Sequence, residues 1–575
     1  MAKYPLAEPQ AMERRSFCKT ATLIGASALI PASSEATIVG TQSIRLGNSM
    51  PSEPTVFSRD DGRHAAGFDQ FEPPLAPGDI TLTIDQLADS GIDTLLFAAG
   101  VEGGMVIYDS RVAQKLGDNV TTWSHPVHYR DARHIRQIVA DGHDRMKMLC
   151  DRSHEKGIWF IPSLCIDIAT YISPLGHGRT SDFVFKHPQF QVGPDKDPRA
   201  TCVQPTRFSF LHPEVRLERF RIFEELLSRF ETDGVEVWAE SGPLCRLDQV
   251  RELTPLMTQW LRDLRRVGDK AGESQRRRKR IFVTLPAKSD SWPLMGYDVA
   301  TWIKEKLVDG LICTSSVSDM HDQDLDLARG VELARGTACR VIAACHAGVA
   351  RQKSRNATQP MIWAAAANAY AQGANGFALD HPHWFGWPWL RDEYETFRIL
   401  GEPQMLETAD KLYRIRSGVK DGTYESIMLG IAQPLPRLLE VARPVTVRLR
   451  VADNLQKYDV LGRVKSVRLR VRVTNLDASR NEIRVVLNGR ELDNSGVEAN
   501  DLTYRITEHG VASPYGYIFE YALPADQYPK QGYNEVALTL VRKDPDIDFN
   551  FELFDVDCLI EYRLHRHFEN RPIEY

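Results

Sequence analysis

Eight short apolar segments between residues 55 and 379 constrain the fold of this chain more than any other feature. Each segment is rich in β-branched and aromatic side chains and is bounded by turn-forming residues, a pattern that predicts a buried strand. Amphipathic stretches separate the segments, and two of these end at Gly157 and Gly373, directly before a strand, as helices do at their C-caps. The strands are expected at 55–57, 94–97, 158–161, 235–238, 281–284, 311–313, 341–344 and 376–379.

Strands that alternate with helices in this way predict an α/β fold, a (β/α)8 TIM barrel spanning 52–410. An open doubly wound sheet is the alternative, but no G-x-G-x-x-G motif follows the first strand. The region is longer than the roughly 250 residues typical of such barrels. The surplus falls in two long loops, 100–143 and 167–212, after the second and third strands. Active sites of barrels lie at that end of the strands, so these loops are expected to build a cleft or a lid.

The pattern changes after residue 410, where strands alternate apolar and polar side chains and no helix is expected between them. Such alternation predicts an antiparallel sandwich with one solvated face over 411–575. Asn488-Gly489 is a strong signal for a hairpin turn. The arginines that alternate along 445–451 and 467–473 are interpreted as the solvated side of a sheet, with a polyanion-binding patch as the alternative.

The first residues resemble a twin-arginine export signal, because Arg14 and Arg15 are followed by Phe17, Lys19 and an uncharged stretch, 20–31. This stretch has about 12 residues and a bilayer span needs about 20, so no membrane span is predicted. We therefore expect a signal peptide over 1–36 and an exported protein, periplasmic or extracellular.

The net charge of the chain and the absence of several sequence motifs exclude some classes of ligand. Lysine and arginine number 71 against 77 acidic residues, and this lack of a basic excess argues against nucleic acid as a partner. The cysteines are scattered with no C-x-x-C pair, which argues against a zinc ribbon or a disulfide scaffold. No P-loop and no dinucleotide fingerprint occurs, so no cofactor is expected.

Carboxylates, histidines and aromatic residues gather where the predicted strands end. This is typical of carbohydrate sites, because aromatic rings stack on sugars and two carboxylates cut glycosidic bonds. The expected partner is therefore a carbohydrate substrate. The predicted substrate-binding residues are Asp61, Asp167, His346, His381, His383, Trp238, Trp384, Trp387 and Trp389.

The fourth strand is the most informative, because Glu236, Trp238 and Glu240 alternate along it and share one face. If that face looks into the barrel, Glu240 lies at the rim and is the candidate general acid. Asp380 is the candidate second carboxylate, with Asp60 or Asp61 next. The structural alternatives are an ion pair for Glu240 and loop or helix capping for the three aspartates. Glu236 is either a like-charge neighbour that shifts a catalytic pKa or a buried ion-pair partner.

The segment Asp233-Gly234-Val235-Glu236-Val237-Trp238-Ala239-Glu240 is similar to the D-G-x-D-x-D-x-E strand of family 18 glycosidases. This resemblance implies a proton-donor role for Glu240. Trp238 stands where that family has the aspartate that orients the substrate acetamide, which argues against acetamide-assisted chemistry. The region 52–410 resembles the glycoside-hydrolase-like family 10 proteins more closely, on D-G-V-E, on His154-Glu155-Lys156-Gly157 and on the tryptophan-rich end of the eighth strand.

Two other functions stay open from the sequence. Asp380, His381, His383 and His346 offer ligands for a metal-dependent hydrolase, although no H-x-H follows the first strand and no H-E-x-x-H occurs. The seventh strand ends in His346, where the wider glycosidase clan has its nucleophilic glutamate. A carbohydrate-binding barrel without catalysis is therefore the second alternative. The favoured prediction is an exported glycoside hydrolase that acts on a poly- or oligosaccharide.

Overall fold

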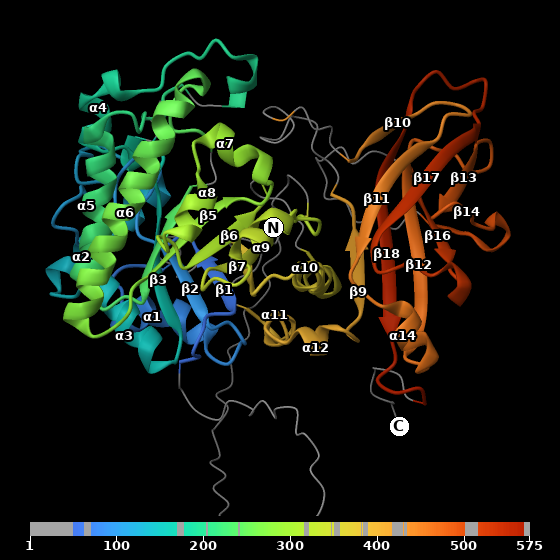
Figure 1. The fold of residues 1–575 in the computed structure, drawn as a ribbon, viewed down its shortest axis with the longest axis horizontal. Helices are drawn as coiled ribbons and strands as arrows, with labels where there is room; N and C mark the ends of the chain where they lie inside the picture. The colour runs from blue at the N-terminus through green and yellow to red at the C-terminus, as the bar shows by residue number, and fades with distance from the viewer. Residues whose placement is uncertain are drawn as a thin grey trace, which may run out of the picture. The chain divides into compact units, whose positions relative to one another are not determined.

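The computed structural model describes residues 50–62, 71–168, 177–202, 205–239, 242–315, 321–346, 348–349, 357–380, 382, 389–416, 429, 434–500 and 516–567. Eight parallel strands pair in chain order and close into a barrel, because the last strand pairs with the first (Figure 1). The predicted (β/α)8 barrel is thereby confirmed. Its strands are β1 (Val56–Asp60), β2 (Thr94–Ala98), β3 (Trp159–Cys165), β4 (Gly234–Trp238), β5 (Arg280–Pro286), β6 (Gly310–Thr314), β7 (Arg340–His346) and β8 (Gly376–Asp380).

Helices flank the barrel strands, and they begin and end where the sequence supplies caps. Asp144 accepts bonds from the first amides of the helix that precedes β3, and Gly157 follows that helix with a φ of 72°. The helices of this part of the chain are α1 (Pro77–Leu87), α2 (Pro126–Ala140), α3 (Arg145–Glu155), α4 (Asp182–Lys186), α5 (Pro213–Ser228), α6 (Val250–Gln275), α7 (Trp292–Met295), α8 (Val299–Lys304), α9 (Ala328–Ala334), α10 (Gln359–Ala371), α11 (Arg391–Arg398) and α12 (Pro403–Leu406).

Side chains that point inward fill the barrel in layers. One layer is wholly apolar and consists of Phe57, Leu96, Ile161, Phe282, Ile312, Ile342, Ala344 and Ala378. Successive side chains of a strand alternate between its faces, so the inward series continues two residues further on. There it meets Arg59 on β1, Ser163 on β3, Thr284 on β5 and Asp380 on β8. The barrel is therefore apolar in one layer and polar in the next, toward the carboxyl ends of the strands.

Two antiparallel sheets form the C-terminal part, as the sequence predicts, although a short helix, α14 (Leu455–Val460), lies between β11 and β12 where no helix is expected. One has the order β10-β18-β12-β16-β15 with β9 paired to β18, and the other has the order β11-β17-β13-β14. Val471, Val485 and Leu538 are fully buried in their common core. The elements are β9 (Lys411–Arg414), β10 (Arg437–Leu439), β11 (Val445–Val451), α14 (Leu455–Val460), β12 (Val464–Thr474), β13 (Glu482–Leu487), β14 (Arg490–Glu491), β15 (Glu498–Asn500), β16 (Gly516–Ala522), β17 (Gly532–Arg542) and β18 (Phe551–Tyr562).

The alternating arginines of β12 differ from the expected solvated face. Arg468 lies 2.9 Å from Glu520 and Arg472 lies 2.6 Å from Asp555, across neighbouring strands of the sheet. Arg472 is only 5% exposed. Ion pairs between strands compensate the positive charge, because β16 and β18 carry carboxylates directly opposite the arginines or diagonal to them, with Asp555 opposite Arg472 and Glu520 diagonal to Arg468.

Contacts join the barrel to the sandwich within one compact unit, Asn48–Tyr575. Ala364 of α10 packs into the sandwich core, and Leu412 of β9 packs against the barrel core. The buried Gln323 side chain donates to the Leu412 carbonyl at 3.0 Å and accepts from the Arg414 amide at 2.8 Å.

In the described part of the chain, no helix has both the length and the apolar character that crossing a bilayer requires.

Candidate functional site

Arg59 organises the polar layer of the barrel. Its Nη2 lies 2.6 Å from Glu236 Oε1 and its Nη1 lies 2.9 Å from Glu236 Oε2, so the guanidinium holds this carboxylate with two parallel bonds. Its Nε donates to Asp380 Oδ1 at 2.6 Å. Thr284 donates to the same Glu236 carboxylate. One cation therefore joins carboxylates from opposite parts of the barrel, β4 and β8.

Strand register explains why these groups meet. Arg59 of β1 stands beside Asp380 of β8, and Glu236 of β4 stands beside Ser163 of β3. All four side chains point inward, because they occupy alternate positions of their strands. Arg59 and Glu236 are fully buried, whereas the Asp380 side chain keeps 8% of its surface exposed. Asp380 is thus the member of the network that lies closest to solvent.

Trp238, the last residue of β4, covers this network. The Arg59 guanidinium carbon lies 4.5 Å from the centroid of the Trp238 ring, a cation–π contact. Trp238 is half-buried, so its ring is neither fully packed nor fully open. Trp238 therefore lies directly over Arg59 at the end of β4.

His346 ends β7 inside the barrel and stands beside Asp380 in register. It is 7% exposed, and its Nδ1 accepts a bond from the Gly348 amide at 3.0 Å. Its backbone carbonyl lies 3.0 Å from Nδ1 of the buried His321. Burial lowers the pKa of His321 to about 4, so this imidazole is neutral near pH 7. A neutral ring therefore supports the backbone at the end of β7.

Asp60 belongs to a turn and a helix contact. The structure extends β1 to Asp60, three residues beyond the predicted end at 57, so Arg59 and Asp60 lie within the strand. Asp60 accepts from the Gly62 amide at 2.7 Å and from the Thr83 hydroxyl of α1 at 2.9 Å. Because it alternates with Arg59, its side chain points toward α1 and away from the interior. This geometry matches the capping alternative for Asp60.

Asp61 lies next to a buried cation. It is 9% exposed, and together with Asp60 and Asp131 it acts electrostatically on Arg145, whose guanidinium also donates to the Gly62 carbonyl at 2.8 Å. Burial is the larger effect on this guanidinium and lowers the pKa of Arg145 to about 10. Asp61 therefore contributes to charge balance behind β1.

Two further predicted residues have partners of their own. Asp167, after β3, lies 3.1 Å from Arg207 and accepts from the Cys165 thiol. Trp389 is 8% exposed and packs edge-on against Phe397 of α11, with ring centroids 4.9 Å apart. Trp389 thus lies in the packing between barrel and helix, where a sugar would not reach its ring.

The other predicted residues lie outside the described part of the chain. They are Glu240, His381, His383, Trp384 and Trp387. Ala239, which precedes Glu240, is 5% exposed, and its carbonyl accepts from the Tyr297 hydroxyl at 2.8 Å. Among the residues that the structure does describe, no three His, Cys, Asp or Glu side chains are grouped as metal ligands.

Arg59 is the residue of this network that the sequence analysis did not select. Its signal is an arginine two positions after the buried Phe57, inside a strand whose five residues are all buried. A charged residue at an inward position of a barrel strand requires a charged partner inside the same barrel. An arginine at this position therefore predicts a carboxylate partner inside the barrel, and the structure supplies two, Glu236 and Asp380.

Comparisons with known proteins give the following likenesses. No protein-family model matches the chain, and no curated protein matches it. The PgaB (BpsB) glycoside hydrolase domain from Bordetella bronchiseptica is similar over 60% of this chain and 98% of its own, with 13% identity and a TM-score of 0.39. An alpha-amylase from Geobacillus thermoleovorans is similar over 85% of this chain and 98% of its own, with 10% identity and a TM-score of 0.35.

An alpha-L-fucosidase from Paenibacillus thiaminolyticus is similar over 61% of this chain, which covers 49% of the fucosidase chain, with 11% identity and a TM-score of 0.36. Likenesses this distant do not establish a function. The barrel itself is established by the pairing of its own eight strands.

Proposed function

We propose that this protein is an exported glycoside hydrolase that acts on a poly- or oligosaccharide at the carboxyl ends of the barrel strands. The observation that carries the proposal is Asp380, an inward-facing carboxylate at the end of β8 whose Oδ1 receives the Arg59 guanidinium at 2.6 Å. Barrel enzymes place their reacting groups at this end of the strands.

The two carboxylates have different roles in this proposal. The Arg59 guanidinium holds the Asp380 carboxylate at 2.6 Å. A carboxylate held at this end of the strands suits a nucleophile, a base or a group that stabilises positive charge on the sugar ring. Glu240, two residues beyond Trp238 in the alternating series of strand 4, is the proposed proton donor. Glu236 is fully buried against Arg59, so we assign it to positioning this cation.

In this proposal Trp238 is the surface on which the sugar ring stacks. Its ring lies over Arg59 and beside the network at the end of β4. Stacking of a sugar ring on an indole favours carbohydrate over other polar ligands. His346, at the end of β7, stands beside Asp380 in register, and the neutral His321 lies 3.0 Å from the His346 carbonyl.

A second function has a specific observation in its favour. Arg59 already binds both described carboxylates of the barrel interior, Glu236 and Asp380, and β7 ends in His346 instead of a carboxylate. These features are compatible with a barrel that binds carbohydrate without cleaving it.

One experiment separates the two functions. The purified protein is incubated with a panel of neutral and acidic polysaccharides, and reducing ends and retained glycan are both measured. A hydrolase releases new reducing ends, and Asp380→Asn lowers that release by at least about 100-fold, while the exposed Asp151→Asn leaves it unchanged. Retention of a glycan with no new reducing ends identifies the binding protein. Activity that survives unchanged in Asp380→Asn contradicts the role given to this carboxylate.

A further inference from the structure

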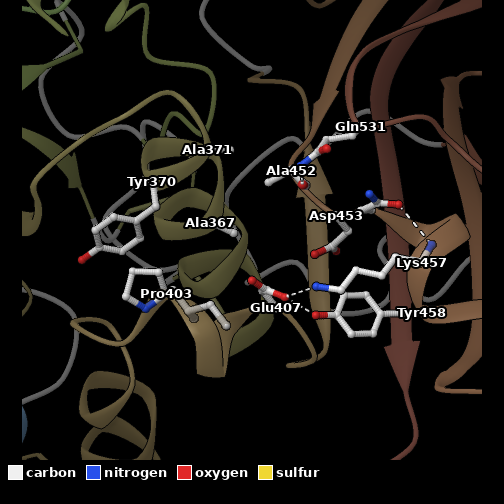
Figure 2. A pocket seen from close by; sticks show the side chains of 12 residues that line it. Ala367, Tyr370, Ala371, Pro403, Glu407, Ala452, Asp453, Lys457, Tyr458 and Gln531 are labelled. Atoms are coloured by element: carbon white, nitrogen blue, oxygen red, sulfur yellow. Dashed lines mark hydrogen bonds and ion pairs between the residues drawn. The ribbon is translucent and has the colours of Figure 1, made fainter. Parts of the chain in front are cut away.

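A pocket lies between the last helices of the barrel and the sandwich, away from the barrel interior. Its volume is about 330 Å³. Figure 2 shows its two walls, one from α10, α12 and Glu407, the other from the segment 452–454, α14 and Gln531. Pockets of this size hold small ligands.

We propose that this junction pocket binds a neutral, hydroxyl-rich molecule, a sugar unit of about one or two rings, as a second carbohydrate site separate from the barrel mouth. The proposal extends the proposed function, because it takes the ligand from the same chemical class. The argument rests on the charge, the apolar surface and the burial of the pocket's lining residues.

Charge balance excludes strongly ionic ligands. Glu407 Oε2 lies 3.0 Å from Lys457 Nζ and also accepts from the Tyr458 hydroxyl, as Figure 2 shows. Asp453 Oδ1 lies 2.9 Å from Lys411 Nζ behind the pocket wall. Each carboxylate of the lining therefore has one ammonium partner, and no net charge is left to attract an anion or a cation.

The lining combines apolar and polar surface in the way that sugars require. Ala367, Ala371, Pro403 and Leu406 supply an apolar wall against which the C–H face of a sugar ring can pack. The opposite wall carries carboxylate, amide and ammonium groups that bond hydroxyls. A purely hydrophobic ligand would leave those polar groups without water, at a cost of about 1–3 kcal/mol for each group.

The lining residues of the pocket differ in how far they are exposed to solvent. Asp453 and Leu406 are buried at its base, with 5% and 1% exposure, whereas Glu407, Lys457 and Gln531 are exposed at its rim. Burial raises the pKa of Asp453, and a hydroxyl that donated to this carboxylate would stabilise its charged form. An exposed rim over a buried polar base gives a small molecule a way in.

The test uses the full chain and a panel of neutral sugars, with glucose, galactose, N-acetylglucosamine, maltose and cellobiose as probes at about 10 mM. Saturation-transfer NMR detects binding, and the variants Ala371→Phe and Gln531→Ala alter the pocket. Ala371 is exposed on α10, so phenylalanine there fills the pocket without entering the core. Ala328→Phe on α9 and Gln456→Ala on α14 are matched exposed controls outside the lining.

We expect at least one sugar to bind the unaltered chain. Ala371→Phe removes the part of this signal that comes from the junction pocket, Gln531→Ala weakens that part about fivefold, and both controls retain it. A sugar bound at the barrel mouth adds a signal of its own, which Ala371→Phe leaves in place. Failure of every sugar to bind, or binding that Ala371→Phe leaves unchanged, overturns the junction site. Polysaccharide cleavage without junction binding refutes this inference alone, and junction binding without cleavage refutes the hydrolase proposal alone.

Discussion

Arg59 links the residues at the centre of the barrel into one unit. It is fully buried, and its charge is balanced by Glu236 and Asp380. A buried ion pair contributes little net stability compared with an apolar replacement of the whole pair, but removal of one partner leaves an uncompensated charge. The network therefore fixes the position of Asp380, and its loss is costly.

Arg59→Met tests this role through stability. The substitution leaves the Glu236 carboxyl group without its two guanidinium bonds inside the barrel, so we expect the free energy of unfolding to fall by about 3–5 kcal/mol. Adding Glu236→Gln removes the unpaired carboxyl group and should restore part of the loss, so that the double variant is more stable than the sum of the single changes predicts. Urea unfolding measures all three variants; additive losses would show that the two groups are not coupled.

For single residues, the sequence identified which side chains lie near the centre of the barrel better than it identified what each of them does. Glu236, Trp238 and Asp380 were selected, and all three lie in the polar layer or directly over it. Asp60 and Trp389 were selected because they follow strands, yet one caps a turn and the other packs on α11. The first strand was predicted to end at residue 57 but continues to Asp60, so Arg59 points inward and Asp60 points outward. The run of three apolar residues does not show how far the strand continues.

The loop after β6 is the element that connects the end of β7 to the sandwich. His321 reaches the His346 carbonyl, and Gln323 reaches β9 and the Met361 carbonyl. Buried side chains that satisfy backbone groups of two other elements hold those elements in register.

The pKa of His321 predicts a pH effect. This pKa is lowered to about 4, below the roughly 6.5 of an unfolded histidine, mainly by burial. The bonds to the His346 and Met361 carbonyls and the charge of Asp322 raise it, and Arg414 lowers it, to smaller extents. Between these values the unfolded chain binds the proton and the folded chain does not. The contribution of His321 to the free energy of unfolding is therefore fully present above about pH 6.5. It is lost as the pH falls toward 4, and the total loss is about 3 kcal/mol. His321→Gln should flatten the unfolding free energy over this window; an unchanged slope would show that His321 is not the group responsible.

Gln323→Ala tests the connection to β9. The substitution leaves the Leu412 carbonyl and the Arg414 amide without their side-chain partner, so we expect a loss of about 2 kcal/mol in unfolding free energy. Amide exchange in 411–416 should accelerate, whereas the exposed Gln259→Ala on α6 should leave both quantities unchanged. Exchange that stays as slow as in the unaltered chain would refute the connection.

The sequence predicted whole elements well where hydrophobic periodicity is strong. All eight barrel strands were placed, and 445–451 coincides with β11. The helix α2 was missed inside the expected loop 100–143, because arginines and histidines surround its buried Ala132, Ile135 and Ile138. The alternating arginines of β12 were expected to be solvated, and cross-strand carboxylates far away in the sequence make them an ion-pair network instead.

At the scale of the whole molecule, export is the proposal that the first residues carry. Arg14→Lys with Arg15→Lys should block export of the full chain in a bacterial host that has the twin-arginine pathway, because that pathway requires the arginine pair. Cell fractionation measures the protein inside and outside the inner membrane. Lys3→Arg, outside the motif, is the charge-conserving control, and equal export of the arginine-to-lysine variant would contradict the signal.

Replacing the proposed proton donor, Glu240, tests the central claim most directly. Glu240→Gln is compared with the exposed Glu224→Gln on a polysaccharide that the protein cleaves and on a dinitrophenyl glycoside of the same sugar. We predict that Glu240→Gln lowers the rate on the polysaccharide by at least about 100-fold and the rate on the dinitrophenyl glycoside far less, because that leaving group departs without a proton. Equal rates for the Glu240→Gln and Glu224→Gln variants on the polysaccharide would contradict the account.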